Sequence, residues 1–309
     1  MKTILFLLIL CWLNTIFYPS AASLLTLRND IKTRLIKEVR QENQNLNVPQ
    51  SIFKIVKYPT PIGEMTAYIS QPKENKQRYP AIIWISGGFP VGGISSSAWT
   101  EQPKSNDQSA KAYRKAGIIT MYPTLRGTHG NPGFQEGFYG EVNDIISALN
   151  FLKQQSYVDP KAIYLGGHST GGTLALLVAA STDEFKAIFA FGPVTSPAGY
   201  GRQYIFYNPE VLYEKHLRSP IYFLSYIETP TFIIEGQNGN TLDLKLLKLA
   251  NQNENITFIT ISGGNHFDIL FSSNQFIASK FIKKKSKELS QNDLQDAYDM
   301  NFKPEKNKN

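Results

Sequence analysis

Short apolar runs alternate with helical stretches along most of this chain. From residue 79 onward, the runs end in glycine, proline or polar residues, as buried strands do. The runs that predict strands are Pro80–Ser86, Ala116–Tyr122, Ala162–Gly166, Ala187–Phe191, Thr231–Glu235 and Ile256–Ser262. The stretches between them that predict helices are Gln108–Lys115, Glu141–Gln155, Thr173–Ala180 and Thr241–Asn251. This alternation predicts an α/β fold, with a mostly parallel sheet covered by helices on both faces.

Two regions depart from this alternation. Apolar residues at helical spacing predict an amphipathic helix over Leu24–Gln41, and two strands follow over Ser51–Tyr58 and Met65–Ser70. The segment Pro193–Thr229 is too long for a plain connection and is rich in aromatic residues. It is either a lid over a site or a helical excursion that packs on the sheet.

The N-terminus has the three-part layout of a secretory signal. Met1-Lys2 is positively charged, Ile4–Tyr18 is mostly apolar, and the small residues of 19–23 suit cleavage by a signal peptidase. We therefore predict an exported protein with a signal peptide at 1–22, one α/β domain at 23–290 and a polar C-terminal tail at 291–309. Membrane association would follow only if the signal remains uncleaved. The lone cysteine, Cys11, lies in this segment, so a mature chain would have neither disulfides nor a thiolate nucleophile.

Composition and charge further restrict the class of protein and its possible partners. The 309 residues are 42% hydrophobic and 18% charged, which fits a packed core rather than a disordered chain. The net charge is +7, but much of it lies in one lysine run around residues 280–287. Without aromatic residues between the lysines or a known nucleic-acid module, that run predicts a solvated helix face and no nucleic-acid partner.

The strongest chemical signal is Gly167-His168-Ser169-Thr170-Gly171, between a predicted strand and a predicted helix. This is the G-x-S-x-G nucleophile elbow, in which a sharp turn exposes a serine in a strained backbone conformation. The glycines are needed because side chains beside the serine would collide with neighbouring strands. Ser169 is therefore the predicted nucleophile.

A serine hydroxyl needs a base, and His266 is the predicted one. It directly follows the last predicted strand and comes after the serine in chain order, as this fold requires. His168 is expected to point away from Ser169 and to pack. His129 and His216 are expected in loops at the surface.

The predicted oxyanion hole consists of two backbone N–H groups. One belongs to Thr170, which follows the nucleophile. The other belongs to a glycine-rich loop after the strand at 80–86, where Gly88 is the first choice and Phe89 the second.

The acid that orients the histidine should follow the strand at 231–235. Glu235 at the strand end and Asp243 further along are both candidates, with Glu235 preferred because a strand end holds a side chain firmly. Asp268 is close to His266 in sequence and is expected to point away.

Together these residues resemble the prolyl oligopeptidase-like branch of the α/β-hydrolases, which includes serine exopeptidases and acyl esterases. The resemblance rests on the glycine-glycine loop after the Pro-Ala-Ile-Ile-Trp strand, Tyr122-Pro-Thr-Leu-Arg-Gly127, Asp144, the elbow, and the final Gly-Asn-His-Phe. It implies the α/β-hydrolase fold and a triad of Ser169, an acid after the seventh strand, and His266. Two features depart from that branch. Its Gly-x-x-Asp acid motif reads Gly236-Gln-Asn-Gly239, and the residues before the first hydrolase strand are too few for a β-propeller.

The predicted function is a serine hydrolase that cleaves an ester or a peptide bond through an acyl-enzyme on Ser169. Its expected substrates are small esters or short peptides, and no cofactor or metal is implied. An acyltransferase and a catalytically inactive binding protein with the same fold remain the alternatives.

Overall fold

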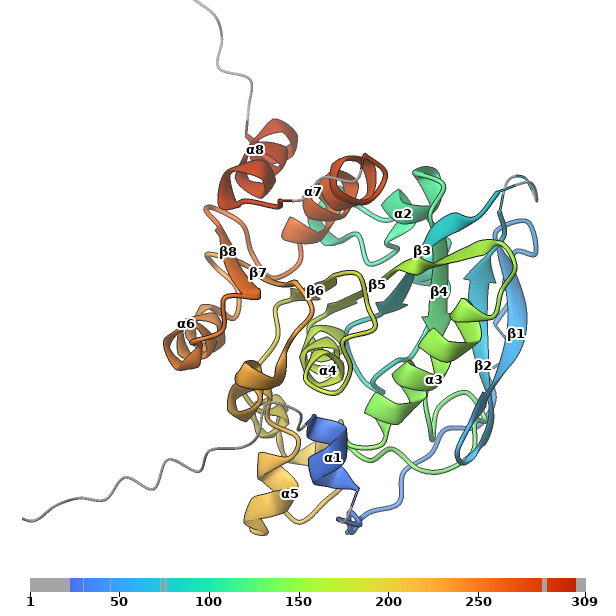
Figure 1. Ribbon diagram of the computed structural model, residues 1–309, viewed down its shortest axis with the longest axis vertical. Coiled ribbons are helices and arrows are strands. Elements are labelled where there is room, and N and C mark those ends of the chain that lie inside the picture. Colours follow the sequence, from blue (N-terminus) through green and yellow to red (C-terminus); the bar gives the residue numbers. More distant parts are fainter. Residues whose placement is uncertain are drawn as a thin grey trace, which may run out of the picture.

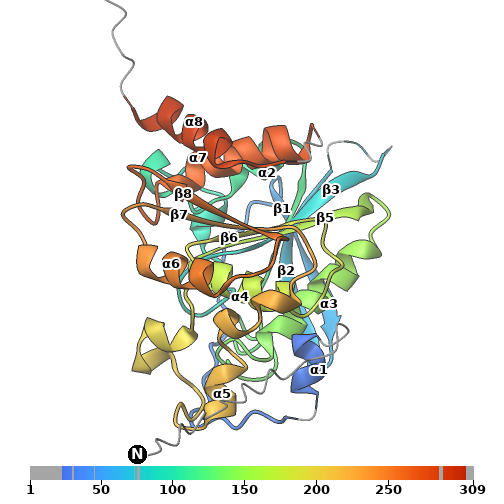
Figure 2. The same cartoon turned by 60° about the vertical axis from the view of Figure 1, so that its left-hand side comes forward.

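The structure is a computed structural model in which the described strands form one sheet with helices on both faces (Figures 1 and 2). It describes residues 23–29, 31–44, 46–72, 74, 77–284 and 288–303. The predicted signal segment 1–22 lies outside these residues. Within them, no helix combines the length and the apolar character that a membrane span requires.

The sheet has the order β1-β2-β4-β3-β5-β6-β7-β8. The pairs β1–β2 and β2–β4 are antiparallel, and every other neighbouring pair is parallel. The strands are β1 (Phe53–Thr60), β2 (Gly63–Ser70), β3 (Tyr79–Ile85), β4 (Ile119–Pro123), β5 (Val158–His168), β6 (Ile188–Phe191), β7 (Thr231–Gly236) and β8 (Ile256–Ile261). The predicted mostly parallel α/β-hydrolase fold is confirmed, because near-continuous apolar runs form strands that are buried on both faces.

Helices lie on opposite faces of this sheet (Figure 2). One layer comprises α3 (Glu141–Lys153), α4 (Thr170–Ala179) and α6 (Thr241–Ala250). The other layer comprises α2 (Lys111–Lys115), α7 (Ile269–Phe276), the π-helical turn η7 (Ile277–Ile282) and α8 (Gln291–Phe302). Every residue of α4 is buried, which explains why its sequence is apolar all round.

The predicted helix over Leu24–Gln41 is wrong beyond its first turns. The helix α1 spans only Leu24–Arg28, and the chain then continues without regular structure. Leu35 forms an isolated bridge with Tyr207, and the Gln41 N–H donates to the Gly127 carbonyl at 2.9 Å. Hydrogen bonds to the distant backbone near Tyr207 and at Gly127 thus take the place of those that a longer helix would make.

The predicted polar tail at 291–309 is also wrong over its described part. Residues 291–302 form α8, which packs against β8 and α7. Ser290 and Asp293 form a capping box at its start. Leu294, Ala297 and Tyr298 are buried at helical spacing on one face. The folded domain thus continues past residue 290.

The segment Pro193–Thr229 is a packed excursion of short helical elements beside α4. These are η3 (Pro197–Tyr200), η4 (Arg202–Tyr204), α5 (Leu212–His216), η5 (Pro220–Tyr222) and η6 (Leu224–Tyr226). Phe206, Tyr207 and Phe223 are buried within it. Glu214 of α5 accepts the Arg34 N–H at 2.8 Å, so the irregular N-terminal segment also holds the excursion in place. Its first elements reach the functional site described next.

Candidate active site

Ser169 lies at the turn between β5 and α4, at the carboxyl end of the strand. Its backbone has φ 55° and ψ −113°, a conformation that non-glycine residues rarely adopt. A Cβ on Gly171 would lie 2.1 Å from the Ile85 carbonyl oxygen, and a Cβ on Gly167 would lie 2.4 Å from the Gly171 carbonyl oxygen. Because of these close approaches, only glycine fits at positions 167 and 171. The strained backbone of Ser169 at this tight turn is the geometry expected of a nucleophile elbow.

His266 and Glu235 form a close pair at the same end of the sheet. His266 Nδ1 lies 2.8 Å from Glu235 Oε2. Glu235 is fully buried at the end of β7 and also accepts two backbone N–H groups, from Gly236 at 2.7 Å and from Asn240 at 2.9 Å. Because the carboxylate is an acceptor, it selects the imidazole tautomer with its proton on Nδ1 and leaves Nε2 as the basic nitrogen.

The other two carboxylates near this edge have different partners. Asp243 Oδ1 accepts the Thr195 N–H at 2.7 Å and the Thr195 hydroxyl at 2.8 Å. These two hydrogen bonds attach Thr195, near the start of the excursion at 193–229, to helix α6. Asp268 accepts the Asn265 N–H at 2.7 Å and lies 3.2 Å from the Tyr298 hydroxyl. Of the two candidate acids, the structure therefore brings Glu235, and not Asp243, to His266.

Two glycines make room for the His266–Glu235 pair. A Cβ on Gly239 would lie 2.4 Å from Glu235 Oε1. A Cβ on Gly192 would lie 2.3 Å from His266 Cε1 and 2.8 Å from Glu235 Oε2. Real side chains do not approach this closely, so the carboxylate occupies space that a side chain at position 239 would otherwise fill.

His168 holds His266 from its other side. Its Nε2 donates to the His266 carbonyl at 2.9 Å, and its Nδ1 lies 3.2 Å from the side-chain amide of Gln108. Burial, and then the proximity of His266, lower the pKa of His168 to about 3, so its ring is neutral near pH 7. His168 packs against the base as expected.

The two remaining histidines differ from each other. His216 is exposed and stacks on Tyr222, at a centroid distance of 4.2 Å. His129 was expected at the surface, but it is buried, with Nε2 3.2 Å from the Ile94 carbonyl oxygen. The difference arises because the loop that follows β4 is buried from residue 124 to residue 129.

The predicted oxyanion donors come from two adjacent segments. The Thr170 hydroxyl donates to the Gly88 carbonyl at 2.7 Å, which joins the loop after β3 to the start of α4. Gly88 has φ +92°, and a Cβ there would meet open space. Within the described chain, the backbone N–H groups of Gly88, Phe89 and Thr170 donate no hydrogen bond to another group. Unpaired donors beside a nucleophile can stabilise an oxyanion.

Tyr200 is a site residue that the sequence did not single out. Its hydroxyl lies 2.7 Å from Thr173 Oγ1 and also faces the Ser169 side chain. Burial raises the pKa of Tyr200, so the phenol stays protonated and can donate a hydrogen bond. The ring packs edge-on against Phe89 at 5.5 Å and stacks on Phe138 at 5.8 Å. Only its position in an aromatic-rich segment hinted at this role.

The described residues contain no group of three or more histidine, cysteine or acidic side chains arranged to hold a metal ion. The site itself combines a serine, a histidine and a carboxylate at the carboxyl edge of the sheet. Backbone N–H donors and a tyrosine hydroxyl surround them.

A family model described as the prolyl oligopeptidase family matches residues 104–276, which is more than half of the chain. The chain belongs to this family. The matched region contains Ser169, Glu235 and His266, whereas Gly88 precedes it.

Curated relatives include both peptidases and a lipase. The uncharacterized peptidase YuxL of Bacillus subtilis (strain 168) is 26% identical over 62% of this chain and 31% of its own length. The thermostable monoacylglycerol lipase of Bacillus sp. (strain H-257) is 30% identical over 33% of this chain and 42% of its own length. The chain therefore spans less than half the length of these relatives.

Solved structures of a peptidase and an esterase share the fold. A puromycin-hydrolyzing peptidase of Mycobacterium tuberculosis is 18% identical, with a TM-score of 0.61 over 78% of this chain and 40% of that chain. The esterase PF2001 of Pyrococcus furiosus is 17% identical, with a TM-score of 0.55 over 78% of this chain and 92% of that chain. At these identities the likeness concerns the fold alone.

Proposed function

We propose that this protein is a serine hydrolase that cleaves ester or amide bonds through an acyl-enzyme on Ser169. The observation that carries the proposal is the contact of 2.8 Å between His266 and the buried carboxylate of Glu235, at the same edge of the sheet as the strained Ser169 elbow. A structural turn would have no need for a buried carboxylate aligned with a histidine. Membership of the prolyl oligopeptidase family supports the same reaction class.

The proposed reaction proceeds by two acyl transfers. His266 Nε2 removes the Ser169 hydroxyl proton while Oγ attacks the substrate carbonyl carbon. The N–H groups of Thr170 and Gly88 stabilise the oxyanion, and Glu235 stabilises the imidazolium. The imidazolium then protonates the leaving alcohol or amine. Water, activated by the same base, attacks the acyl-enzyme and releases the acid.

We propose small esters or short peptides with an apolar group next to the cleaved bond as substrates. An aromatic cluster beside Ser169 supports this, because Phe89 stacks on Tyr204 at 3.7 Å and packs against Tyr200. Such rings favour apolar partners. The relatives, which include peptidases and a lipase, leave both bond types within the proposal.

We further propose that the protein is exported through the segment at 1–22 and acts without nucleic acid. The positively charged start and the apolar run that follows support export. Cell fractionation with and without residues 1–22 tests this part. Retention of both forms in the cytosol would contradict it.

Hydrolysis of p-nitrophenyl acetate and p-nitrophenyl butyrate tests the reaction directly. We expect turnover by the wild type and a loss of about 10⁴-fold or more in Ser169→Ala. Circular dichroism of the variant controls for folding. A folded wild type without any turnover on esters or on short peptide amides would contradict the proposal and favour a binding protein of the same fold.

A further inference from the structure

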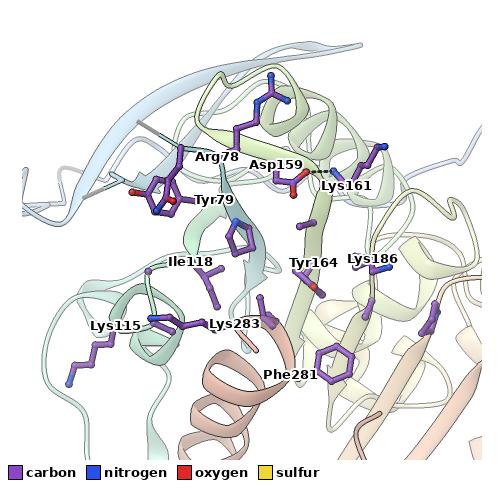
Figure 3. Close-up of a pocket in the computed structure, with 18 of the residues that line it drawn as sticks. Arg78, Tyr79, Lys115, Ile118, Asp159, Lys161, Tyr164, Lys186, Phe281 and Lys283 are labelled. Carbon is purple, nitrogen blue, oxygen red and sulfur yellow. Dashed lines mark hydrogen bonds between the residues drawn. The ribbon is translucent and has the colours of Figure 1, made fainter. Parts of the chain in front are cut away.

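A large cavity lies at the opposite end of the sheet from Ser169. It has a volume of about 940 Å³ and opens where β3, β5 and β6 begin, beside η7 (Figure 3). Ala162 of β5 lines it, whereas Ser169 follows the other end of the same strand. At ~3.3 Å per residue, the two positions are roughly 20 Å apart along the strand. The cavity is therefore separate from the proposed active site.

The inner part of the cavity is apolar and well ordered by packing. Phe232 and Phe281 line it, and their ring centroids are 5.5 Å apart. Both residues are buried, so each exposes only a small part of its surface to the cavity. Ile118 and Tyr164 add to the same apolar lining. Figure 3 shows Ile118 and Tyr164 between the charged residues at the margin of the cavity. A lining of this kind favours a hydrocarbon group.

The margin of the cavity is basic. Basic side chains line it at Arg78, Lys115, Lys161, Lys186 and Lys283, against acidic ones at Glu74 and Asp159. None of the basic residues forms an ion pair with another described residue. One of the two acids already has a hydrogen-bond partner, because Asp159 Oδ1 accepts the Lys161 backbone N–H at 3.0 Å. Unpaired cations around a low-dielectric cavity concentrate positive potential at its opening.

Two lysine-rich segments of the chain do not complement the cavity. The sequence that leaves η7 is Lys283-Lys284-Lys285, and the C-terminal residues 303–309 contain three more lysines and one acid. Both segments carry the same charge sign as the margin, so insertion of either would be opposed by repulsion. The occupant that matches the basic margin of the cavity should therefore carry a negative charge.

We propose that this cavity binds a single-chain amphiphile with an anionic head group, such as a fatty acid or an alkyl phosphate. The chain lies against Phe232, Phe281 and Ile118. The head group is held at the margin by Arg78, Lys161 and Lys186, whose long, flexible stems can turn their charged ends toward it. Binding at this end of the sheet is independent of catalysis at Ser169.

Isothermal titration calorimetry with dodecanoate tests the proposal. Acetate carries the head group without the chain, and dodecyltrimethylammonium carries the chain with the opposite charge. We expect binding of dodecanoate at one site per chain, weakened by added salt, and no measurable binding of the other two compounds. Equal binding of dodecyltrimethylammonium would overturn the proposal, because the margin would then have no role.

Paired variants locate the binding. Lys161→Glu/Lys186→Glu should bind dodecanoate about ten-fold more weakly or worse, because the head group then meets reversed charges. Lys54→Glu/Lys57→Glu on β1 makes the same change in net charge outside the cavity and should bind as the wild type does. Ala162→Phe, which fills the cavity without a change in charge, should also lose binding. Thermal unfolding shows whether each variant is folded. Wild-type affinity in the Lys161→Glu/Lys186→Glu variant or in folded Ala162→Phe would overturn the assignment.

Discussion

The two ends of the parallel sheet differ in how their polar groups are used. At the carboxyl end, the polar side chains are paired with one another or with the backbone, as Glu235 is with His266 and Asp243 is with Thr195. At the amino end, Lys161 and Lys186 surround an apolar cavity and have no ion-pair partner among the described residues. Internal pairing fixes groups in advance for a reaction, whereas unpaired charges remain available to a ligand. The carboxyl end is thus organised for catalysis, whereas the amino end is organised for the ligand that we propose.

The largest effect in this comparison is expected from Glu235→Gln. The amide preserves the shape of the side chain but cannot stabilise the imidazolium or accept every N–H that the carboxylate accepts. We expect kcat for p-nitrophenyl acetate to fall by about 10³–10⁴-fold. Asp243→Asn, at the alternative acid, should cost less than about ten-fold, since its partner is Thr195. A greater loss in Asp243→Asn than in Glu235→Gln would reverse the assignment of the acid.

Gly239→Ala should have the next largest effect. The added Cβ would lie 2.4 Å from Glu235 Oε1 and would push the carboxylate away from His266. A displacement of about 1 Å costs on the order of 10² in rate. Gly199→Ala is the matched control, because a Cβ at position 199 would meet no atom within 4 Å. Equal kcat values for the two variants would show that the space at position 239 is not needed.

His168 should make the carboxyl end sensitive to acid. Burial lowers its folded-state pKa to about 3, while the unfolded chain has an ordinary value near ~6.5. The unfolded state thus binds the proton first, and stability falls as the pH drops from about 6.5 towards 3. The contribution of this residue amounts to about 2 kcal/mol at pH 5.

Urea unfolding at pH 7 and at pH 5 measures this effect. In His168→Gln, the loss of unfolding free energy between pH 7 and pH 5 should be smaller than in the wild type by about 2 kcal/mol. An identical loss in both proteins would mean that His168 does not remain neutral when folded.

The smallest effect is expected from charge reversal at the amino end. Lys161→Glu/Lys186→Glu should hydrolyse p-nitrophenyl acetate within about two-fold of the wild type, because the substitutions lie far from Ser169 and share no partner with it. Steady-state kinetics at matched ionic strength measures this. A loss comparable with that of Gly239→Ala would show that the two ends of the sheet are coupled.

Much of the fold was predictable from the sequence, because buried parallel strands appear as apolar runs. The elbow at Ser169 was predictable too, since its glycines are dictated by backbone contacts within a few residues. Long-range contacts were not predictable. The segment after Arg28 has helical periodicity, yet it pairs with distant backbone at Tyr207 and Gly127.

The candidate site shows the same division. The sequence placed Ser169 and His266 but left Glu235 and Asp243 as alternatives, because the choice depends on space vacated by Gly239 and Gly192. Tyr200 could not be assigned to the site, since its position depends on how the excursion folds over α4. The helix α8, by contrast, carried a readable signal in the capping box of Ser290 and Asp293.

The most direct test of the central claim is mass spectrometry of the protein after treatment with a fluorophosphonate probe. Such probes modify a serine only where a base activates its hydroxyl. We expect one adduct per chain, mapped by peptide analysis to Ser169, and labelling that is strongly slowed in Glu235→Gln but not in Asp243→Asn. A folded protein that forms no adduct, or an adduct on a residue other than Ser169, would contradict this claim.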